Sequence, residues 1–270
     1  MSDRAASDGE RADAAPVAPP KRRRLRRILA WVFGSLGALI LLAVVGFLLY
    51  ANIGVMAADP DDLAAVRADP SISLTDAGGA WVMAPTAGAG DTGLVFIPGA
   101  KVDPLAYAAT LAGVVDDGVT VVITKPTLNL AFFDLRPLSA FTDLVPGIDA
   151  WSVGGHSLGG VKACQLAEDA DGLVLFGSYC ANDLSGTELP ALSISGSQDG
   201  LSTPQKIDDA KHLLPADAEF VVIEGGNHAG FGAYGPQAGD GEATIPDTEI
   251  RAQITDVLGP FLLETVPQSQ

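Results

Sequence analysis

Residues 153–160 read VGGHSLGG, and this stretch is the most informative part of the sequence about the fold. An apolar run over residues 148–153 leads into it, and an amphipathic run follows it. Gly155, Ser157 and Gly159 fill a G-x-S-x-G pattern, which carries chemistry when a sharp turn joins a strand to a helix. Glycines are needed there because the strand and helix backbones pass close to each other. The stretch therefore predicts a strand, a strained turn that exposes the Ser157 hydroxyl, and a helix whose N-terminus faces an oxyanion at that point.

Two later stretches place polar residues directly after apolar runs. Residues 195–199, SGSQD, end with Asp199, and residues 225–228, GGNH, end with His228. The order Ser, Asp, His, with each residue following a predicted strand, is the triad order of the α/β-hydrolases. On these three motifs the chain resembles that superfamily, in particular the compact, lidless group related to dienelactone hydrolases (alpha/beta hydrolase fold-5). The resemblance covers roughly residues 80–265 and implies a mostly parallel central sheet flanked by helices.

Strands alternate with helices along this part of the chain, which is the pattern of an α/β fold whose parallel sheet is covered on both faces. The predicted strands cover residues 80–84, 93–97, 119–124, 148–154, 172–176, 191–195 and 219–223. The predicted helices cover residues 59–68, 104–115, 134–144, 158–167, 202–213 and 248–263, the third of them short, irregular and interrupted by Pro137. Only about ten residues separate Cys180 from the strand near Pro190, so no helical lid fits there and we expect an open site.

Ser157 is the predicted nucleophile. A serine hydroxyl attacks an acyl carbon only once a positioned base takes its proton, and histidine is the usual base. Of the three histidines, His156 lies in the turn beside the nucleophile, where it cannot easily fold back, and His212 ends a predicted surface helix. His228 follows a strand in a glycine-rich loop. We therefore expect His228 to act as the base, and then as the acid that protonates the leaving group.

A carboxylate is expected to hold the imidazole in the required tautomer and to stabilise its charged form. Asp199 is the favoured candidate, because it follows a strand and the next helix begins cleanly after it. Asp183 follows the preceding strand and remains an alternative, although its Asn-Asp-Leu context is typical of a helix cap or a turn. The predicted triad is therefore Ser157, Asp199 and His228.

An acyl-transfer site also needs two backbone N–H donors directed at the developing oxyanion. One is the N–H of Leu158, the residue after the nucleophile. The resemblance assigns the second to Ala100, in the loop of residues 98–101 (PGAK), with Gly99 nearby. The same loop could also be a plain turn. Residues 125–130 follow a strand at the same edge of the sheet, and they either line the pocket or form a turn.

A strongly apolar segment precedes the predicted domain. Residues 21–27 hold six basic side chains, and the 23 residues from 28 to 50 contain no charge. A helix of that length is about 34 Å long, enough to cross a hydrocarbon core of about 30 Å. The uninterrupted length disfavours a buried core helix, and residues 55–57 fit a signal-peptide cleavage site poorly. We therefore expect a single transmembrane helix, with the basic side in the cytoplasm and the following domain outside it.

These patterns divide the chain into four predicted segments. Residues 1–27 form a disordered, basic cytoplasmic tail, and residues 28–50 form the transmembrane helix. Residues 51–79 are a connector, and residues 80–270 are the α/β-hydrolase domain. The predicted partners are a lipid bilayer, through residues 28–50, and a small acyl-ester substrate.

Charge is distributed unevenly along the chain. Residues 1–50 carry eight basic and four acidic side chains, whereas residues 51–270 carry eight basic and 29 acidic ones. Because this globular part is so acidic, it repels phosphates, and nucleic acid is excluded as a partner. We interpret the acidic surface as a solvated one.

The two cysteines, Cys164 and Cys180, do not have the spacing of metal ligands. Outside the cytoplasm they could form a disulfide, and otherwise they are two small buried hydrophobic residues. The sequence contains no phosphate-binding G-x-x-x-x-G-K motif. It matches G-x-G-x-x-G at residues 88–93 and 230–235, but neither match directly follows a predicted strand and opens a predicted helix, as dinucleotide binding requires. We therefore expect no cofactor and no metal.

Together, these observations predict a membrane-anchored, outward-facing serine hydrolase that cleaves esters, or similar acyl bonds, through an acyl-serine intermediate. An acyltransferase would use the same nucleophile with an alcohol in place of water. A catalytically silent hydrolase fold that serves as an anchored binding module is the third possibility, and the intact triad argues against it. Fold alone does not fix the substrate.

Overall fold

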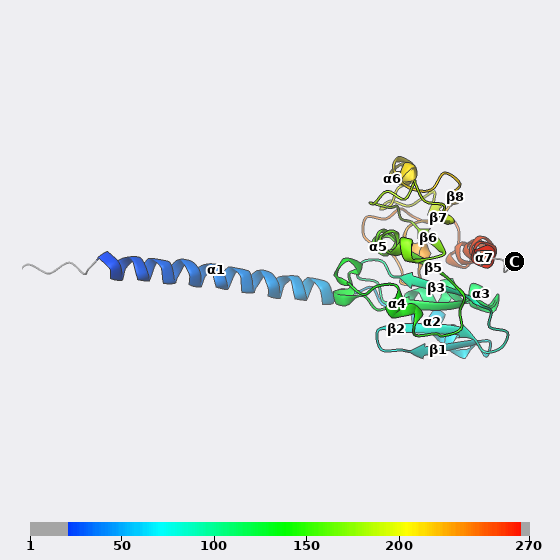
Figure 1. Ribbon diagram of the computed structural model, residues 1–270, viewed down its shortest axis with the longest axis horizontal. Coiled ribbons are helices and arrows are strands. Elements are labelled where there is room, and N and C mark those ends of the chain that lie inside the picture. Colours follow the sequence, from blue (N-terminus) through cyan, green and yellow to red (C-terminus); the bar gives the residue numbers. More distant parts are fainter. Residues whose placement is uncertain (1–20, 266–270) are drawn as a thin grey trace, which may run out of the picture. The chain divides into compact units, whose positions relative to one another are not determined.

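Eight strands form one sheet in the order β1-β2-β4-β3-β5-β6-β7-β8 (Figure 1). The computed structural model describes residues 21–265. The strands are β1 (Ile72–Asp76), β2 (Ala80–Pro85), β3 (Thr92–Ile97), β4 (Thr120–Thr124), β5 (Ala150–His156), β6 (Gly172–Phe176), β7 (Ala191–Gly196) and β8 (Glu219–Ile223). The β1–β2 and β2–β4 pairs are antiparallel and all other neighbours are parallel. The predicted mostly parallel sheet is confirmed.

Helices cover both faces of this sheet (Figure 1). The α-helices of this part of the chain are α2 (Pro60–Ala68), α3 (Ala108–Asp116), α4 (Ser139–Thr142), α5 (Leu158–Leu166), α6 (Pro204–Ala210) and α7 (Asp247–Glu264). Short 3₁₀ turns are η1 (Pro104–Tyr107), η2 (Thr127–Asn129), η3 (Ala131–Phe133), η4 (Ala167–Asp169), η5 (Lys211–Leu213) and η6 (Ala229–Phe231). Residues of α2, α3 and α7 belong to the core on one face, and residues of α4 and α5 to the core on the other.

Strand β3 shows why the parallel strands have continuous apolar sequences. Leu94 and Phe96 belong to the core cluster on one face, and Val95 and Ile97 to the cluster on the other. Successive side chains of a strand point to opposite faces, so a strand covered on both sides must be apolar throughout. All six residues of β3 are buried.

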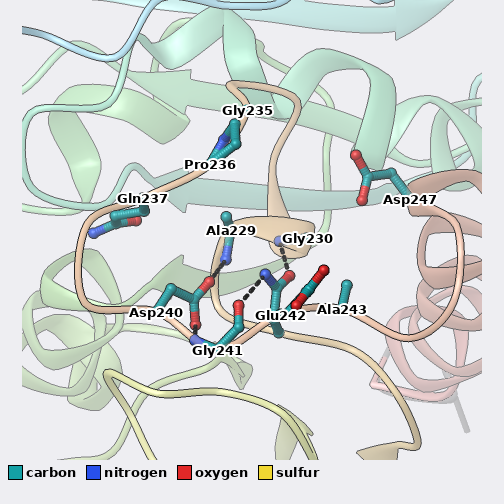
Figure 2. Close-up of a pocket in the computed structure, with 11 residues that line it drawn as sticks. Ala229, Gly230, Gly235, Pro236, Gln237, Asp240, Gly241, Glu242, Ala243 and Asp247 are labelled. Carbon is teal, nitrogen blue, oxygen red and sulfur yellow. Dashed lines mark hydrogen bonds between the residues drawn. The ribbon is translucent and has the colours of Figure 1, made fainter.

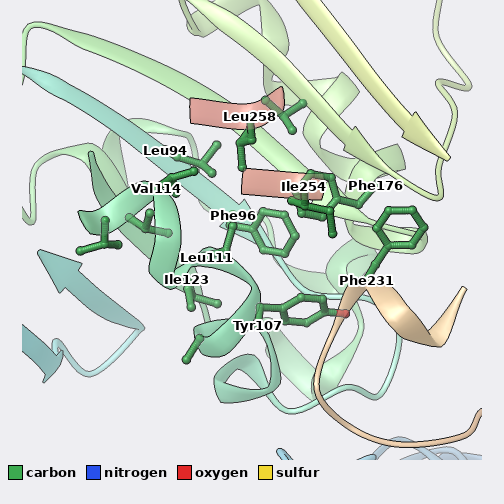
Figure 3. Packing of buried hydrophobic residues seen from close by; sticks show 14 of the residues in the cluster. Leu94, Phe96, Tyr107, Leu111, Val114, Ile123, Phe176, Phe231, Ile254 and Leu258 are labelled. Carbon is green, nitrogen blue, oxygen red and sulfur yellow. The ribbon is translucent and has the colours of Figure 1, made fainter. Parts of the chain in front are cut away.

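The larger core cluster reaches the carboxyl ends of the parallel strands (Figure 3). The ring of Phe96 lies 5.0 Å from that of Tyr107 and 5.2 Å from that of Phe176, measured between centroids. Phe231 packs on Phe176 at 5.7 Å. Because Phe231 follows the predicted base by three residues, this packing anchors the loop of His228 in the core.

Strand β1 lies within residues 51–79, the predicted connector. Its residues Ile72 and Leu74 are the more buried ones, and the residues between and after them are exposed. Such alternation is the mark of a half-buried strand. β1 pairs with β2 and so extends the sheet at one edge. The predicted helix 59–68 is present in the same segment as α2, with Asp59 as its N-cap.

The predicted irregular helix over residues 134–144 is reduced to α4, a single turn of four residues. Pro137 supplies no N–H and disfavours helical backbone at the residue before it, so helix cannot extend back through this point. The Asp134 carboxylate accepts hydrogen bonds from the guanidinium and the backbone N–H of Arg136 instead of capping a helix.

Helix α1 (Lys21–Asn52) is long and apolar enough to cross a membrane, with a mean hydropathy of 2.6 over its most apolar window and no part of that window buried. Residues 1–20 of the predicted disordered tail lie outside the described residues. Residues 21–27, which that tail was expected to include, are helical, because Arg, Lys and Leu are good helix formers and continue the apolar helix. The described residues divide into two units between Leu48 and Leu49, so the last residues of α1 belong to the unit that contains the sheet.

Cys164 of α5 and Cys180, which follows β6, form a disulfide with their Cα atoms 5.6 Å apart. Of the two possibilities that the sequence leaves open, the structure therefore has the disulfide. The bond ties the helix after Ser157 to the loop after β6.

Candidate active site

Ser157 lies in a sharp turn between β5 and α5, with a φ of 52° and a ψ of −121°. A non-glycine residue with positive φ costs roughly 1–3 kcal/mol and persists only where the surroundings enforce it. The flanking glycines make the turn possible. A Cβ on Gly155 would lie 2.4 Å from the carbonyl carbon of Gly159, and a Cβ on Gly159 would lie 2.0 Å from the oxygen of Ile97. The predicted steric reason for this motif is therefore visible in the backbone.

Asp199 and His228 form a buried pair. Asp199 Oδ2 lies 2.7 Å from His228 Nδ1, and both side chains are fully buried. Asp199 Oδ1 accepts hydrogen bonds from the N–H groups of Leu201 (2.8 Å) and Ser202 (2.7 Å). These donors hold the carboxylate with one oxygen toward the ring. When His228 donates through Nδ1, its Nε2 is left as the proton acceptor.

The serine turn and the Asp199–His228 pair meet at the end of β6. The N–H of Ser157 donates to the carbonyl of Phe176 at 3.0 Å. The next residue, Gly177, has a φ of 46°, and a Cβ there would lie 2.9 Å from Asp199 Oδ2 and 3.2 Å from His228 Nδ1. Within the described residues, His228 Nε2 is buried and has no hydrogen-bond partner, the Ser157 hydroxyl included. Catalytic hydrogen bonds of this kind often close only when substrate is bound.

His156 is buried beside the base, with the two imidazole centroids 4.3 Å apart. The hydroxyl of Tyr107 accepts from the Gly99 N–H at 2.9 Å and forms a second hydrogen bond, 2.9 Å long, with His156 Nδ1. Burial, and secondarily the neighbouring His228, hold the pKa of His156 well below its usual value. Burial also raises the pKa of Tyr107. His156 is therefore neutral and places no positive charge against the base.

The two predicted oxyanion donors lie on segments in close contact. A Cβ on Gly159, in the first turn of α5, would lie 2.5 Å from the carbonyl oxygen of Pro98. The Gly99 N–H is taken by the Tyr107 hydroxyl. Among the described residues, no protein group accepts a hydrogen bond from the N–H of Ala100 or of Leu158. Both donors remain available to an oxyanion.

The rival residues lie elsewhere. Asp183 accepts hydrogen bonds from the hydroxyl and the N–H of Ser185, which lower its pKa, and it forms a turn rather than an ion pair with an imidazole. His212 Nδ1 lies 2.9 Å from the carbonyl of Asp209 on an exposed 3₁₀ turn. Of the two candidate aspartates, Asp199 is the one bonded to His228.

Asp240 is a site residue that the sequence motifs did not predict. Its Oδ1 accepts from the N–H groups of His228 (3.1 Å) and Gly200 (3.1 Å), and its Oδ2 accepts from that of Ala229 (2.8 Å). Gly200 follows Asp199 directly, so one carboxylate ties together the loops that carry Asp199 and His228. Figure 2 shows this carboxylate at the wall of a hollow of about 390 Å³ formed by the loop after His228. The sequence feature that could have pointed to Asp240 is its position in a glycine-rich loop, because aspartates in such loops commonly accept hydrogen bonds from backbone N–H groups.

Within residues 21–265, no group of three or more His, Cys, Asp and Glu side chains is arranged to hold a metal ion.

Comparison with known proteins agrees with this architecture. A model of the alpha/beta hydrolase family matches residues 93–252, more than half of the chain. The esterase domain of a Rhodothermus marinus protein has a TM-score of 0.54 at 14% identity, over 70% of this chain and 97% of that one. A thermophilic esterase from Thermogutta terrifontis, solved with malate bound, has a TM-score of 0.50 at 15% identity, over 73% and 98%. A search of curated proteins gives no match. At such identities the two structures establish a shared fold.

Proposed function

Because the chain belongs to the alpha/beta hydrolase family, we propose that it is a membrane-anchored serine hydrolase that cleaves carboxylic esters or similar acyl bonds. One observation carries the proposal: a buried Asp199–His228 pair, 2.7 Å between Oδ2 and Nδ1, lies against the strained turn of Ser157. Nucleophile, base and orienting carboxylate come from three loops at one edge of the sheet, which is the arrangement that acyl transfer requires.

In the proposed reaction the Ser157 oxygen attacks the acyl carbon while His228 Nε2 takes the hydroxyl proton. The carbonyl oxygen becomes an oxyanion that accepts hydrogen bonds from the N–H groups of Ala100 and Leu158. His228 then gives its proton to the leaving alcohol, and the acyl group stays on Ser157. A water molecule, deprotonated in turn by His228, releases the acid and restores the serine. Asp199 remains ionised and stabilises the imidazolium.

The anchor in this proposal is α1, with residues 28–50 in the bilayer. The basic residues 21–27 favour the cytoplasmic side, which leaves the domain outside. The Cys164–Cys180 disulfide supports the same orientation, since disulfides persist in oxidising compartments and are rare in the cytosol.

Labelling of the full chain in detergent with a fluorophosphonate probe tests the proposal. We expect the wild type to be labelled at Ser157 and to hydrolyse a short nitrophenyl ester. The Ser157→Ala variant should lose the label and at least 10³-fold in kcat, as expected when a member of a catalytic triad is removed. Ser185→Ala, which alters an exposed turn, is the matched control and should behave like the wild type. Wild-type protein that takes no label and cleaves no ester would contradict the proposed function.

A further inference from the structure

The segment that follows β4 exposes large apolar side chains at its surface. We call residues 127–135, which contain η2 and η3, the β4 loop. Phe132 is 47% exposed and Leu135 is 87% exposed, whereas Ala131 and Asp134 between and beside them are buried. Single exposed leucines are ordinary on protein surfaces, so exposure alone assigns this loop no role. Its position in the fold is what gives the exposure a meaning.

The β4 loop contacts the residues at which α1 ends. The side-chain amide of Asn129 donates to the carbonyl of Ala51 at 3.1 Å. The carbonyl of Asn129 accepts from the N–H of Lys101 at 2.8 Å, and the Lys101 ammonium lies 4.3 Å from the centre of the Tyr50 ring. All of these residues belong to the unit that contains the sheet. If residues 28–50 span the bilayer, Tyr50 and Ala51 lie at its surface, and so does Asn129.

Chain geometry then limits how far the apolar side chains can be from the lipid. Consecutive Cα atoms are about 3.8 Å apart, so Phe132 lies within about 11 Å of Asn129. The headgroup layer on one side of a bilayer is roughly 5–8 Å thick, from the difference between the total and the hydrocarbon thickness. If Asn129 lies at the bilayer surface, Phe132 is within about 11 Å of that surface, and its side chain can reach the boundary between headgroups and acyl chains.

The β4 loop carries fewer free negative charges than the rest of the domain, so an anionic or neutral lipid surface repels it less. From residue 125 to 138 the charged side chains are Lys125, Asp134 and Arg136. Asp134 is buried and bonded to Arg136, and Lys125 pairs with Asp76. The loop therefore presents no unpaired carboxylate, although residues 51–270 as a whole carry 29 acidic and eight basic side chains.

The same loop borders the candidate active site. η3 lies against α5, the helix that begins immediately after Ser157. Asn129 holds the backbone of Lys101, the neighbour of the proposed oxyanion donor Ala100. The β4 loop thus touches both segments that are proposed to supply the oxyanion donors, α5 and the loop that contains Lys101.

We propose that Phe132 and Leu135 insert into the bilayer surface, and that the site draws its substrate from the membrane: an acyl ester of a lipid, whose carbonyl lies at the headgroup boundary. This proposal rests on the proposed function. In the reaction, the bond between acyl carbon and ester oxygen breaks, the lipid alcohol leaves with the proton that His228 took from Ser157, and water converts the acyl-serine to a fatty acid. An ester of this kind could reach Ser157 without leaving the lipid phase.

The test uses the full chain reconstituted in phosphatidylcholine vesicles. One substrate, nitrophenyl palmitate, is carried in the vesicle membrane, and the other, nitrophenyl acetate, is dissolved in the buffer. We expect the double variant Phe132→Ser/Leu135→Ser to lose tenfold or more in kcat/KM on the palmitate and less than twofold on the acetate. Leu263→Ser, an equally apolar change at a residue that is 48% exposed on α7, is the matched control and should affect neither substrate.

A second readout does not depend on activity. Tryptophan introduced at position 132 (Phe132→Trp) should be quenched by brominated lipids in the vesicles more strongly than tryptophan at position 263 (Leu263→Trp). Equal loss on both esters, no loss on either, or equal quenching at the two positions would contradict the proposal. Wild-type protein inactive on the acetate would contradict the proposed function, while the quenching measurement would still test the membrane contact.

Discussion

At the scale of single residues, backbone N–H groups do much of the positioning in this site. Asp199 and Asp240 both accept hydrogen bonds from the backbone of the loops that carry the proposed catalytic residues. A hydrogen bond to an ionised carboxylate contributes about 1.5–3 kcal/mol, roughly twice that of a neutral pair. Two carboxylates arranged in this way fix His228 from both sides: one through its ring and one through its own N–H.

The position of Asp240 leads to a prediction about catalytic rate. In Asp240→Asn, one carboxylate oxygen becomes an NH₂ group that cannot accept from a backbone N–H. Leaving one such donor unpaired costs about 1–3 kcal/mol, so we expect kcat to fall roughly 5- to 100-fold with KM changed less than threefold. Steady-state kinetics on a short ester measure this. Glu242→Gln removes the same charge from an exposed position in the same loop and should leave kcat unchanged. A KM effect with an unchanged kcat and pH profile would contradict a positioning role for Asp240.

His156 leads to a prediction about stability and pH. Its pKa in the folded state is lowered, chiefly by burial, whereas in the unfolded chain a histidine titrates near 6.5. As the pH falls below about 6.5, the unfolded chain binds a proton at this histidine that the folded chain does not bind. The free energy of unfolding therefore falls by up to about 1.4 kcal/mol per pH unit below that pH. Urea unfolding between pH 7 and 5 should show a shallower loss in His156→Gln than in the wild type. The exposed His212→Gln serves as control, and identical slopes in all three proteins would refute this.

At the scale of elements, the disulfide links α5 to the loop after β6, across 16 positions of the sequence. Closing a loop of about that length stabilises a protein by roughly 3 kcal/mol. We expect the Cys164→Ala/Cys180→Ala variant to melt about 6–12 °C below the wild type, given the usual relation between free energy and Tm for a domain of this size. Differential scanning calorimetry measures the difference. Adding a reductant should lower the Tm of the wild type and leave that of the variant unchanged. A wild type insensitive to reductant would be incompatible with this bond.

The strands could be predicted because their apolar runs are continuous and bounded by turn residues. The predicted strands 93–97, 172–176 and 219–223 match β3, β6 and β8 to within one residue. β1 escaped prediction because an edge strand is buried on one side only and its pattern is short. The helix expected over residues 134–144 was wrong in extent, since Pro137 limits it to one turn.

At the scale of the whole molecule, the proposed anchor and the uneven charge lead to a prediction about topology. The basic residues 21–27 should remain in the cytoplasm. In intact cells, an impermeant protease should remove a tag placed after residue 270 and leave a tag placed before residue 1 protected. Detergent permeabilisation, which exposes both tags, is the control. Protection of the C-terminal tag in intact cells would contradict an outward-facing domain.

The sequence predicts seven of the eight strands, the glycine-lined turn of Ser157 and the candidate triad, because these depend on local patterns of apolar, small and turn-forming residues. The folded structure alone shows which aspartate bonds to His228, that Cys164 and Cys180 are joined, and that Asp240 bonds to two loops, at Gly200 and at His228. These contacts join residues far apart in the chain, and nothing in their local sequence encodes the partner. They exist because the carboxyl ends of parallel strands meet at one edge of the folded sheet.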